Sequence, residues 1–155
     1  MNQDLELTLK LVMAGLKKAK ELASRFDLVF RIFIAVNPIS GDSFTLKLPH
    51  VNTICMNIFL QKMSKEIGES EAVVIMDSAG WHKSKDLVVP KNITITLLPP
   101  YCPELNPVER LWLYIKQNTI KNKIYESIAA LEVMVCDFIK NLKVDQIKQI
   151  CNFSY

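Results

Sequence analysis

The chain has 155 residues, of which 50% are hydrophobic, and a formal net charge of +3. This length and hydrophobicity predict one globular domain with a proper core and exclude a largely disordered chain. The net charge is too small to require an anionic partner, so nucleic-acid binding has to be argued from the placement of the basic residues.

The cysteines and the N-terminal residues indicate an intracellular protein. The four cysteines form no CxxC pair and have no histidine at zinc-finger spacing, which argues against a metal finger or a disulfide framework. Asp4 and Glu6 interrupt the N-terminal leucines, and no uncharged apolar run is long enough to span a membrane. We expect a soluble cytoplasmic protein with reduced thiols and no membrane partner.

Residues 3–25 are compatible with either a strand or a helix. A strand is favoured by leucines at every second position, namely Leu5, Leu7, Leu9 and Leu11. Helical spacing connects a second set, namely Leu5, Leu9, Val12, Leu16, Ala19 and Ala23. Leucine, lysine and alanine are good helix formers, so we predict a divergent helical segment over residues 1–27, with the strand as the alternative.

A hairpin, a helix and a strand are predicted next. The stretch "LVFRIFIAVNPISGDSFTLKLP" has two β-rich runs around Asn-Pro and Gly-Asp turn residues, which predicts a hairpin of residues 28–36 and 43–48. An amphipathic helix is predicted for "NTICMNIFLQKMSKEIG", with Asn52 or Thr53 as its N-cap and Gly68 as its stop. The apolar run "AVVIMD" is typical of a central strand.

The rest of the chain completes an α/β pattern. The run "ITITLLP" predicts another strand, and helices are predicted over residues 107–119, 126–141 and 143–151. Strands followed by helices in this order predict an α/β domain in which a sheet is flanked by helices.

Two carboxylates are the candidates for chemistry. Asp77 ends an apolar strand, and ligands of open α/β sheets bind beyond the carboxyl ends of strands, although a simple turn is the alternative. Glu109 follows Asn106 and Pro107 at the spacing of a helix capping box. The two carboxylates can also converge on one hard cation such as Mg²⁺.

Basic and aromatic side chains follow both carboxylates. The candidates for binding DNA phosphates are His82, Lys83, Lys85, Arg110 and Lys116. A solvated surface is the alternative for the lysines. Trp81 and Trp112 can stack on bases, although a tryptophan next to an apolar strand or helix more often belongs to the core.

Two stretches together closely resemble the catalytic domain of mariner-type insertion-sequence transposases, which are DDE enzymes. These are "VVIMDSAGWHKS" and "ITITLLPPYCPELNPVERLWLYIK", and the likeness extends over roughly residues 30–155. The resemblance implies an RNase H-like mixed sheet flanked by helices. It also implies that Asp77 and Glu109 are the second and third catalytic carboxylates, holding two Mg²⁺ or Mn²⁺ ions about 3.5–4 Å apart for DNA cleavage and joining in transposition.

The family's first aspartate should lie on a strand before the hairpin, and nothing in residues 1–29 resembles that strand. We therefore expect residues 28–155 to be a truncated transposase domain that lacks the usual first strand and is inactive or weak alone. The implied partners are transposon-end DNA in the nucleoid, a second copy, or a separate N-terminal transposase fragment. The alternatives are a non-catalytic DNA-binding or oligomerisation remnant, and a product that folds poorly because the hairpin edge is exposed.

Overall fold

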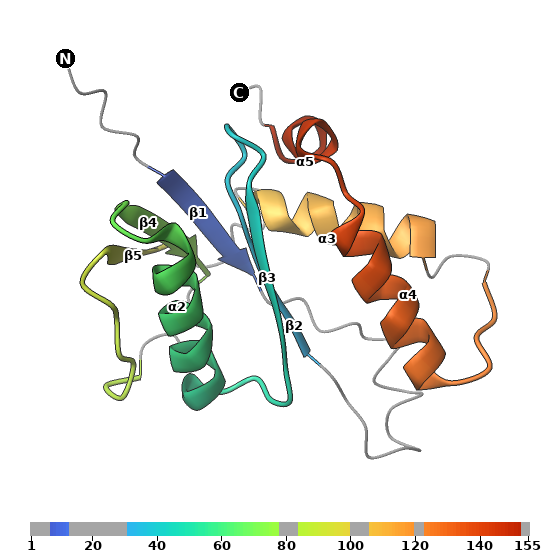
Figure 1. The fold of residues 1–155 in the computed structure, drawn as a ribbon, viewed down its shortest axis with the longest axis horizontal. Helices are drawn as coiled ribbons and strands as arrows, with labels where there is room; N and C mark the ends of the chain where they lie inside the picture. Colours follow the sequence, from blue (N-terminus) through green and yellow to red (C-terminus); the bar gives the residue numbers. More distant parts are fainter. Residues whose placement is uncertain (1–6, 13–30, 78–83, 100–105, 120–122, 153–155) are drawn as a thin grey trace.

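The computed structural model describes residues 7–12, 31–77, 84–99, 106–119 and 123–152. Its centre is a five-stranded sheet with the strand order β3-β2-β1-β4-β5 (Figure 1). The strands are β1 (Leu7–Val12), β2 (Arg31–Val36), β3 (Ser43–Leu48), β4 (Ala72–Met76) and β5 (Ile93–Leu97). The β3-β2-β1 pairs are antiparallel and the β1-β4-β5 pairs are parallel, so the sheet is mixed as expected.

The N-terminal segment contributes the middle strand of the sheet. β1 pairs with β2 on one side and with β4 on the other, from Leu7 opposite Ala72 to Leu11 opposite Met76. The predicted helix is therefore wrong for Leu7–Val12, and so is the prediction that the first strand is lacking. The remainder of the predicted helical segment, residues 1–6 and 13–27, lies outside the described residues.

Pairing along both edges explains why the strand replaces the helix. Helix propensities differ by only about 0.7 kcal/mol or less between ordinary residues, whereas a central strand bonds its backbone on both sides. The alternating leucines and the β-branched Thr8 were the local signals for this outcome. β1 pairs with Ile34–Val36 and so covers this part of the β2 edge, which the expectation of a poorly folding product took to be exposed.

The predicted helices are confirmed with small shifts at their ends. They are α2 (Thr53–Ile67), α3 (Pro107–Thr119), α4 (Ile128–Lys140) and α5 (Val144–Cys151). Asn52, one of the two predicted caps, begins α2 by accepting a 2.9 Å hydrogen bond from the Cys55 N–H. Gly68 ends α2 with a φ of +62°, a conformation that favours glycine.

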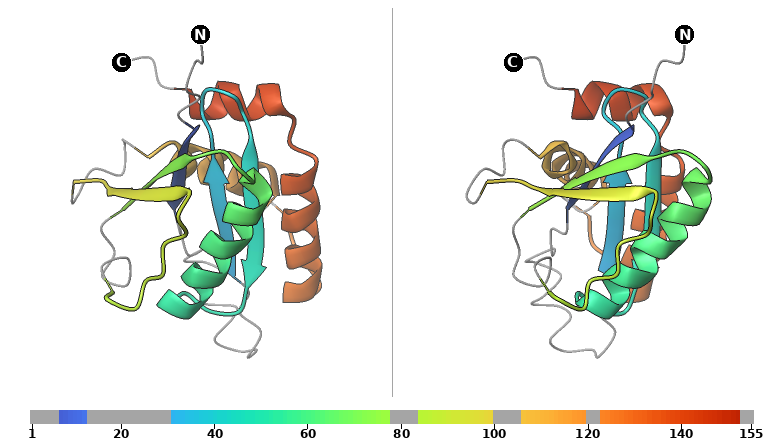
Figure 2. Two further views of the ribbon diagram at one scale, coloured as in Figure 1. Left: turned by 60° about the vertical axis from the view of Figure 1, so that its left-hand side comes forward. Right: turned by 90° about the vertical axis from the view of Figure 1, so that its left-hand side faces the viewer.

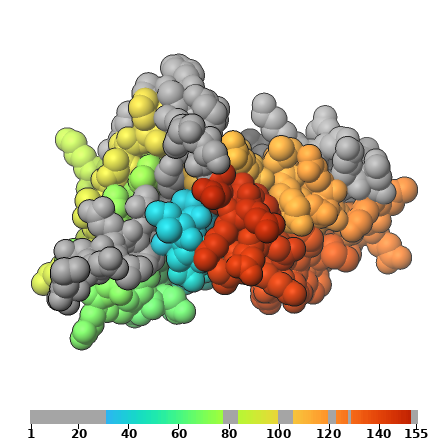
Figure 3. Space-filling model, turned by 90° about the horizontal axis from the view of Figure 1, so that it is seen from above, coloured from blue at the N-terminus to red at the C-terminus, as the bar shows by residue number. Residues whose placement is uncertain are grey.

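The predicted hairpin is confirmed for the described residues, with Arg31 opposite Leu48 and Val36 opposite Ser43. Its turn packs against α5, and the two lie side by side in Figure 3. Gly41 makes this approach possible, because its φ is +78° and an added Cβ would come within 2.5 Å of the Val144 carbonyl oxygen.

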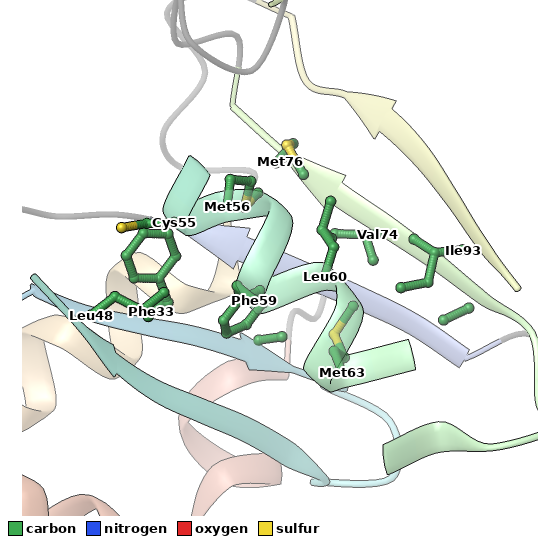
Figure 4. Close-up of a cluster of buried hydrophobic side chains, with 12 residues drawn as sticks. Phe33, Leu48, Cys55, Met56, Phe59, Leu60, Met63, Val74, Met76 and Ile93 are labelled. Carbon is green, nitrogen blue, oxygen red and sulfur yellow. The ribbon is translucent and has the colours of Figure 1, made fainter. Parts of the chain in front are cut away.

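The helices cover the sheet in two unequal layers. α2 packs on one face, and α3, α4 and α5 pack on the other (Figure 2). The α2-face core consists of apolar residues from α2 and the sheet, which include Phe33, Met56, Phe59, Leu60, Met63 and Met76 (Figure 4). Trp112 is 3% exposed in the opposite core, which confirms the core alternative for this residue. No helix in the described ranges is long and apolar enough to cross a membrane.

Candidate active site

The end of β4 directs Asp77 toward the face of the sheet that α3 covers. Ala72, Val74 and Met76 are buried in the α2-face core, and successive residues of a strand point to opposite faces. Immediately before Asp77, the Met76 carbonyl oxygen accepts a 2.8 Å hydrogen bond from the Leu98 N–H, which holds the backbone in place. Asp77 is half-buried, and its Oδ1 atom is fully shielded from solvent.

The start of α3 positions Glu109 through its buried neighbour. Asn106 is 2% exposed, and its Oδ1 atom accepts a 3.2 Å hydrogen bond from the Val108 N–H. Pro107 occupies the first helical position, where its missing N–H costs nothing. The predicted helix start is thus confirmed. Among the described hydrogen bonds, none joins the Glu109 carboxylate to the Asn106 N–H, so the capping box stays a prediction.

Electrostatics connect Glu109 with Asp77 and Lys116. Burial raises the pKa of Glu109 above its ordinary value, Lys116 lowers it, and the negative charge of Asp77 raises it further. Lys116 follows Glu109 by two helical turns and therefore lies on the same side of α3. The charges of Asp77 and Lys116 therefore lie near enough to Glu109 to influence its ionisation.

The strand beside Asp77 contains no third carboxylate. β1 has the sequence LTLKLV, and Leu11 lies opposite Met76 in the parallel pair. Continuing this register by one residue places Val12 opposite Asp77. Within its described bounds, Leu7–Val12, β1 contains no Asp or Glu, so the expectation that the first catalytic Asp is missing stays a prediction, whereas the expectation that the strand itself is missing is wrong.

Residues 13–132 match the family model described as DDE superfamily endonuclease. The chain belongs to this family. Over 116 residues it is 40% identical to the "Uncharacterized protein y4pE/y4sA" of Sinorhizobium fredii (strain NBRC 101917 / NGR234), with 74% of this chain and 85% of the relative covered.

Solved structures with low sequence identity share the fold of this DDE family member. The catalytic domain of Mos1 mariner transposase matches with a TM-score of 0.62 and 12% identity, over 94% of this chain and 75% of that one. The catalytic core domain of BIV integrase matches with a TM-score of 0.55 and 16% identity, over 89% and 86% of the two chains. These similarities confirm the predicted RNase H-like fold.

A longer retroviral protein also matches the chain. It belongs to a simian T-cell lymphotropic virus intasome in complex with PP2A regulatory subunit B56 gamma. The TM-score is 0.56 at 16% identity, over 87% of this chain but only 49% of the other. The DDE domain therefore spans about half of that chain.

Among the described residues, Asp77 and Glu109 have the chemistry to hold a hard cation. Mg²⁺ and Mn²⁺ prefer oxygen ligands, which Asp77 and Glu109 supply, with water able to fill further positions. Within the described ranges, no three or more His, Cys, Asp or Glu side chains gather as a metal site. The described residues therefore supply two carboxylates, Asp77 and Glu109, rather than the three of the triad that the resemblance implied.

The predicted DNA-binding residues are distributed unequally around this site. Lys85 is exposed, whereas Lys116 is half-buried with Glu109. Arg110 donates a 3.3 Å hydrogen bond from Nη1 to the Asn152 carbonyl oxygen and so connects α3 with the end of α5. His82 and Lys83 lie outside the described residues. Their predicted role in DNA binding stays a prediction.

Sequence reasoning missed two features of the site. Lys116 lowers the pKa of Glu109, an effect that the sequence analysis did not foresee, and its predicted contact with DNA phosphates stays a prediction. Val12 was placed in a helix, whereas the strand register puts it next to Asp77. The spacing of Glu109 and Lys116 on one helix could have revealed the first feature, but only the strand pairing reveals the second.

Proposed function

We propose that this chain is a DDE domain of DNA transposition with an incomplete catalytic site. It binds transposon-end DNA in the nucleoid and holds one divalent ion through Asp77 and Glu109. Strand cleavage and joining require a further carboxylate, which a separate transposase polypeptide supplies. The observation that carries this proposal is the absence of any acid in β1, the strand that lies beside Asp77.

Charge balance explains why the site favours one ion. Removing a carboxylate from a two-ion site leaves excess positive charge and an incomplete coordination shell, so the second ion binds poorly. Lys116 adds a positive charge close to Glu109 and disfavours a second cation further. When bound, the single ion supplies Lewis acidity to a phosphate oxygen, while Asp77 and Glu109 hold and orient it.

Calorimetric titration with Mn²⁺ tests the ion site. We expect weak binding of one ion per chain, which Asp77→Ala and Glu109→Ala each abolish. Asp86→Asn is the matched control, because it removes an exposed carboxylate elsewhere and should leave Mn²⁺ binding unchanged. Binding of two ions per chain, or binding that survives both alanine variants, would contradict the proposed site.

A restoration experiment tests the missing acid. Val12→Asp places a carboxylate opposite Asp77 in the strand register, and we expect it to introduce Mn²⁺-dependent cleavage of DNA that the natural chain lacks. Val12→Asn is the control of nearly equal size without the charge. Adding Glu109→Gln to Val12→Asp should abolish the gain. Robust Mn²⁺-dependent cleavage by the natural chain, lost in Glu109→Ala, would show that its site is already complete.

A second candidate function is DNA binding without catalysis, which the same acid-free β1 favours. Phosphate contacts do not need the metal, so salt-dependent DNA affinity should then be unchanged by Asp77→Ala. Loss of DNA affinity in Asp77→Ala, measured with Mn²⁺ present, would instead connect DNA binding to the ion site.

A further inference from the structure

One asparagine side chain of α2 holds the connector between β4 and β5. Asn57 donates a 3.0 Å hydrogen bond from Nδ2 to the Asp86 carbonyl oxygen, and its Oδ1 atom accepts a 2.8 Å hydrogen bond from the Val88 N–H. Both polar ends of the amide therefore bind the backbone of one segment, which lies 29–31 residues further along the chain. Figure 2 shows the described part of this connector beside the start of α2.

The segment that Asn57 holds is a tight turn. The Leu87 N–H donates a 3.2 Å hydrogen bond to the Ser84 carbonyl oxygen, and the Asp86 N–H donates one of the same length to the Ser84 hydroxyl oxygen. Leu87 is half-buried against the α2-face core. Lys85 occupies the second position of this turn and is exposed, and it forms no ion pair with another described residue. We call this segment the 84–87 turn.

The 84–87 turn lies at the edge of the sheet where β4 ends. Met56, the residue before Asn57, is fully buried. It belongs to the same core cluster as Met76, the residue before Asp77, and Figure 4 shows the two methionine side chains at the same end of that cluster. Asn57 therefore fixes the turn at the edge of the sheet that carries Asp77.

A second asparagine fixes the opposite end of the connector. Asn92 donates a 2.9 Å hydrogen bond from Nδ2 to the Gly68 carbonyl oxygen and accepts a 2.6 Å hydrogen bond from the Ser64 hydroxyl. Gly68 ends α2, and Asn92 directly precedes β5. The connector is thus bound to α2 at both ends, and Asn57 is the side chain that binds it at the end close to Asp77.

We propose that Asn57 is a positioning residue that orients Lys85 toward a DNA phosphate beside Asp77. This inference rests on the proposed function, in which the domain binds DNA. A lysine on an unrestrained loop loses conformational freedom when it contacts a phosphate, whereas a turn that is fixed before binding reduces this cost. Asparagine is a poorer helix former than alanine, so helix propensity does not account for Asn57 in α2.

A double-mutant cycle of DNA affinity tests whether Asn57 acts through Lys85. Lys85→Gln should weaken binding and lower the slope of log affinity against log salt concentration by about 0.9, the contribution of one phosphate contact. Asn57→Ala should weaken binding roughly two- to tenfold in the natural chain, but should have no effect in the Lys85→Gln chain. Fluorescence anisotropy of a labelled duplex of arbitrary sequence, titrated with the full chain at several salt concentrations, measures both quantities.

Hydrogen exchange tests the hydrogen bonds of Asn57 without DNA. The Val88 amide donates to Asn57 Oδ1, so Asn57→Ala should speed the exchange of this amide roughly tenfold. NMR measures the exchange, and circular dichroism confirms that each variant folds. An unchanged exchange rate would overturn the proposed hold on the turn.

Asn92→Ala is the matched control, because it releases the end of the connector away from Asp77 and should leave DNA affinity unchanged. Three results would overturn the role of Asn57 while leaving the proposed function intact. These are unchanged affinity in Asn57→Ala, an equal loss when Asn57→Ala is added to Lys85→Gln, and an equal loss in Asn92→Ala. A natural chain without salt-dependent DNA binding would overturn both proposals, even if the Val88 amide still responded to Asn57→Ala.

Discussion

The two faces of the sheet differ in what they bury. On the α2 face, the fully buried cluster is apolar or sulfur-containing, and the polar Ser64 and Asn92 beside it are half-buried. On the opposite face, α3 carries buried Thr119 and begins at buried Asn106, close to the half-buried Asp77 and Glu109. Burying polar groups stabilises a fold less than burying apolar ones. The comparison indicates that the α2 face supplies stability, whereas the α3 face holds polar groups in place for ligand binding.

The largest expected effect comes from the α2 face. Phe59 is fully buried, and its ring centroid lies 5.6 Å from that of Phe33 and 5.1 Å from that of Phe44. Phe59→Ala should lower the free energy of unfolding by about 3–5 kcal/mol, because it leaves a cavity among rings. Urea denaturation measures this change.

Ile58→Ala is the control for the α2 face, because Ile58 is the adjacent residue on α2 and is 39% exposed. Its effect on the free energy of unfolding should be below about 1 kcal/mol. If Phe59→Ala and Ile58→Ala lowered the free energy of unfolding equally, the α2-face core would not be the main source of stability.

An intermediate effect is expected at the start of α3. Asn106→Ala removes the buried oxygen that accepts the hydrogen bond from the Val108 N–H, so the free energy of unfolding should fall by about 1–2 kcal/mol. Because this cap also positions the first turn of α3, Mn²⁺ affinity should fall as well. Asn106→Ser keeps a neutral capping oxygen and should recover much of both losses. If Asn106→Ala lowered stability but left Mn²⁺ affinity unchanged, the cap would not be needed to position Glu109 for ion binding.

The smallest effect should have the opposite sign. In the folded protein, burial and Asp77 raise the pKa of Glu109 above 4.5, despite the opposing effect of Lys116. The folded state therefore binds this proton more tightly than the unfolded state does. The resulting stabilisation is present at low pH and is lost as pH rises from the unfolded pKa through the folded pKa.

Glu109→Gln tests the direction of this effect on stability, because glutamine has nearly the same side-chain shape as glutamate but cannot ionise. It should raise the Tm by on the order of 1 °C at pH 7, since Glu109 is partly solvated, and by less as pH falls toward about 4. Differential scanning calorimetry at several pH values measures the trend. A destabilisation at pH 7 would mean that the charged form of Glu109 is favoured by the fold, contrary to the direction of its pKa shift.

Local chemistry made much of the fold predictable. Asn52 and Gly68 delimit α2, and Asn106 with Pro107 starts α3, because these residues satisfy or omit backbone groups within a few positions of themselves. The hairpin was equally readable from its turn residues. β1 could not be predicted in the same way, because its alternating leucines also fit a helix. Its partner strand β4 begins only at Ala72, far along the sequence, so no nearby residue indicated the pairing.

By itself, the sequence determined which residues could do chemistry here: Asp77 at a strand end, Glu109 in the first turn of a helix, and a family motif that joins them. Only the tertiary structure decided that the first strand is present, that the residue opposite Asp77 is Val12, and that Lys116 acts on Glu109. The physical reason is range. Caps and turns are settled by neighbouring residues, whereas strand register and the coupling of charges depend on segments that meet only when the chain has folded.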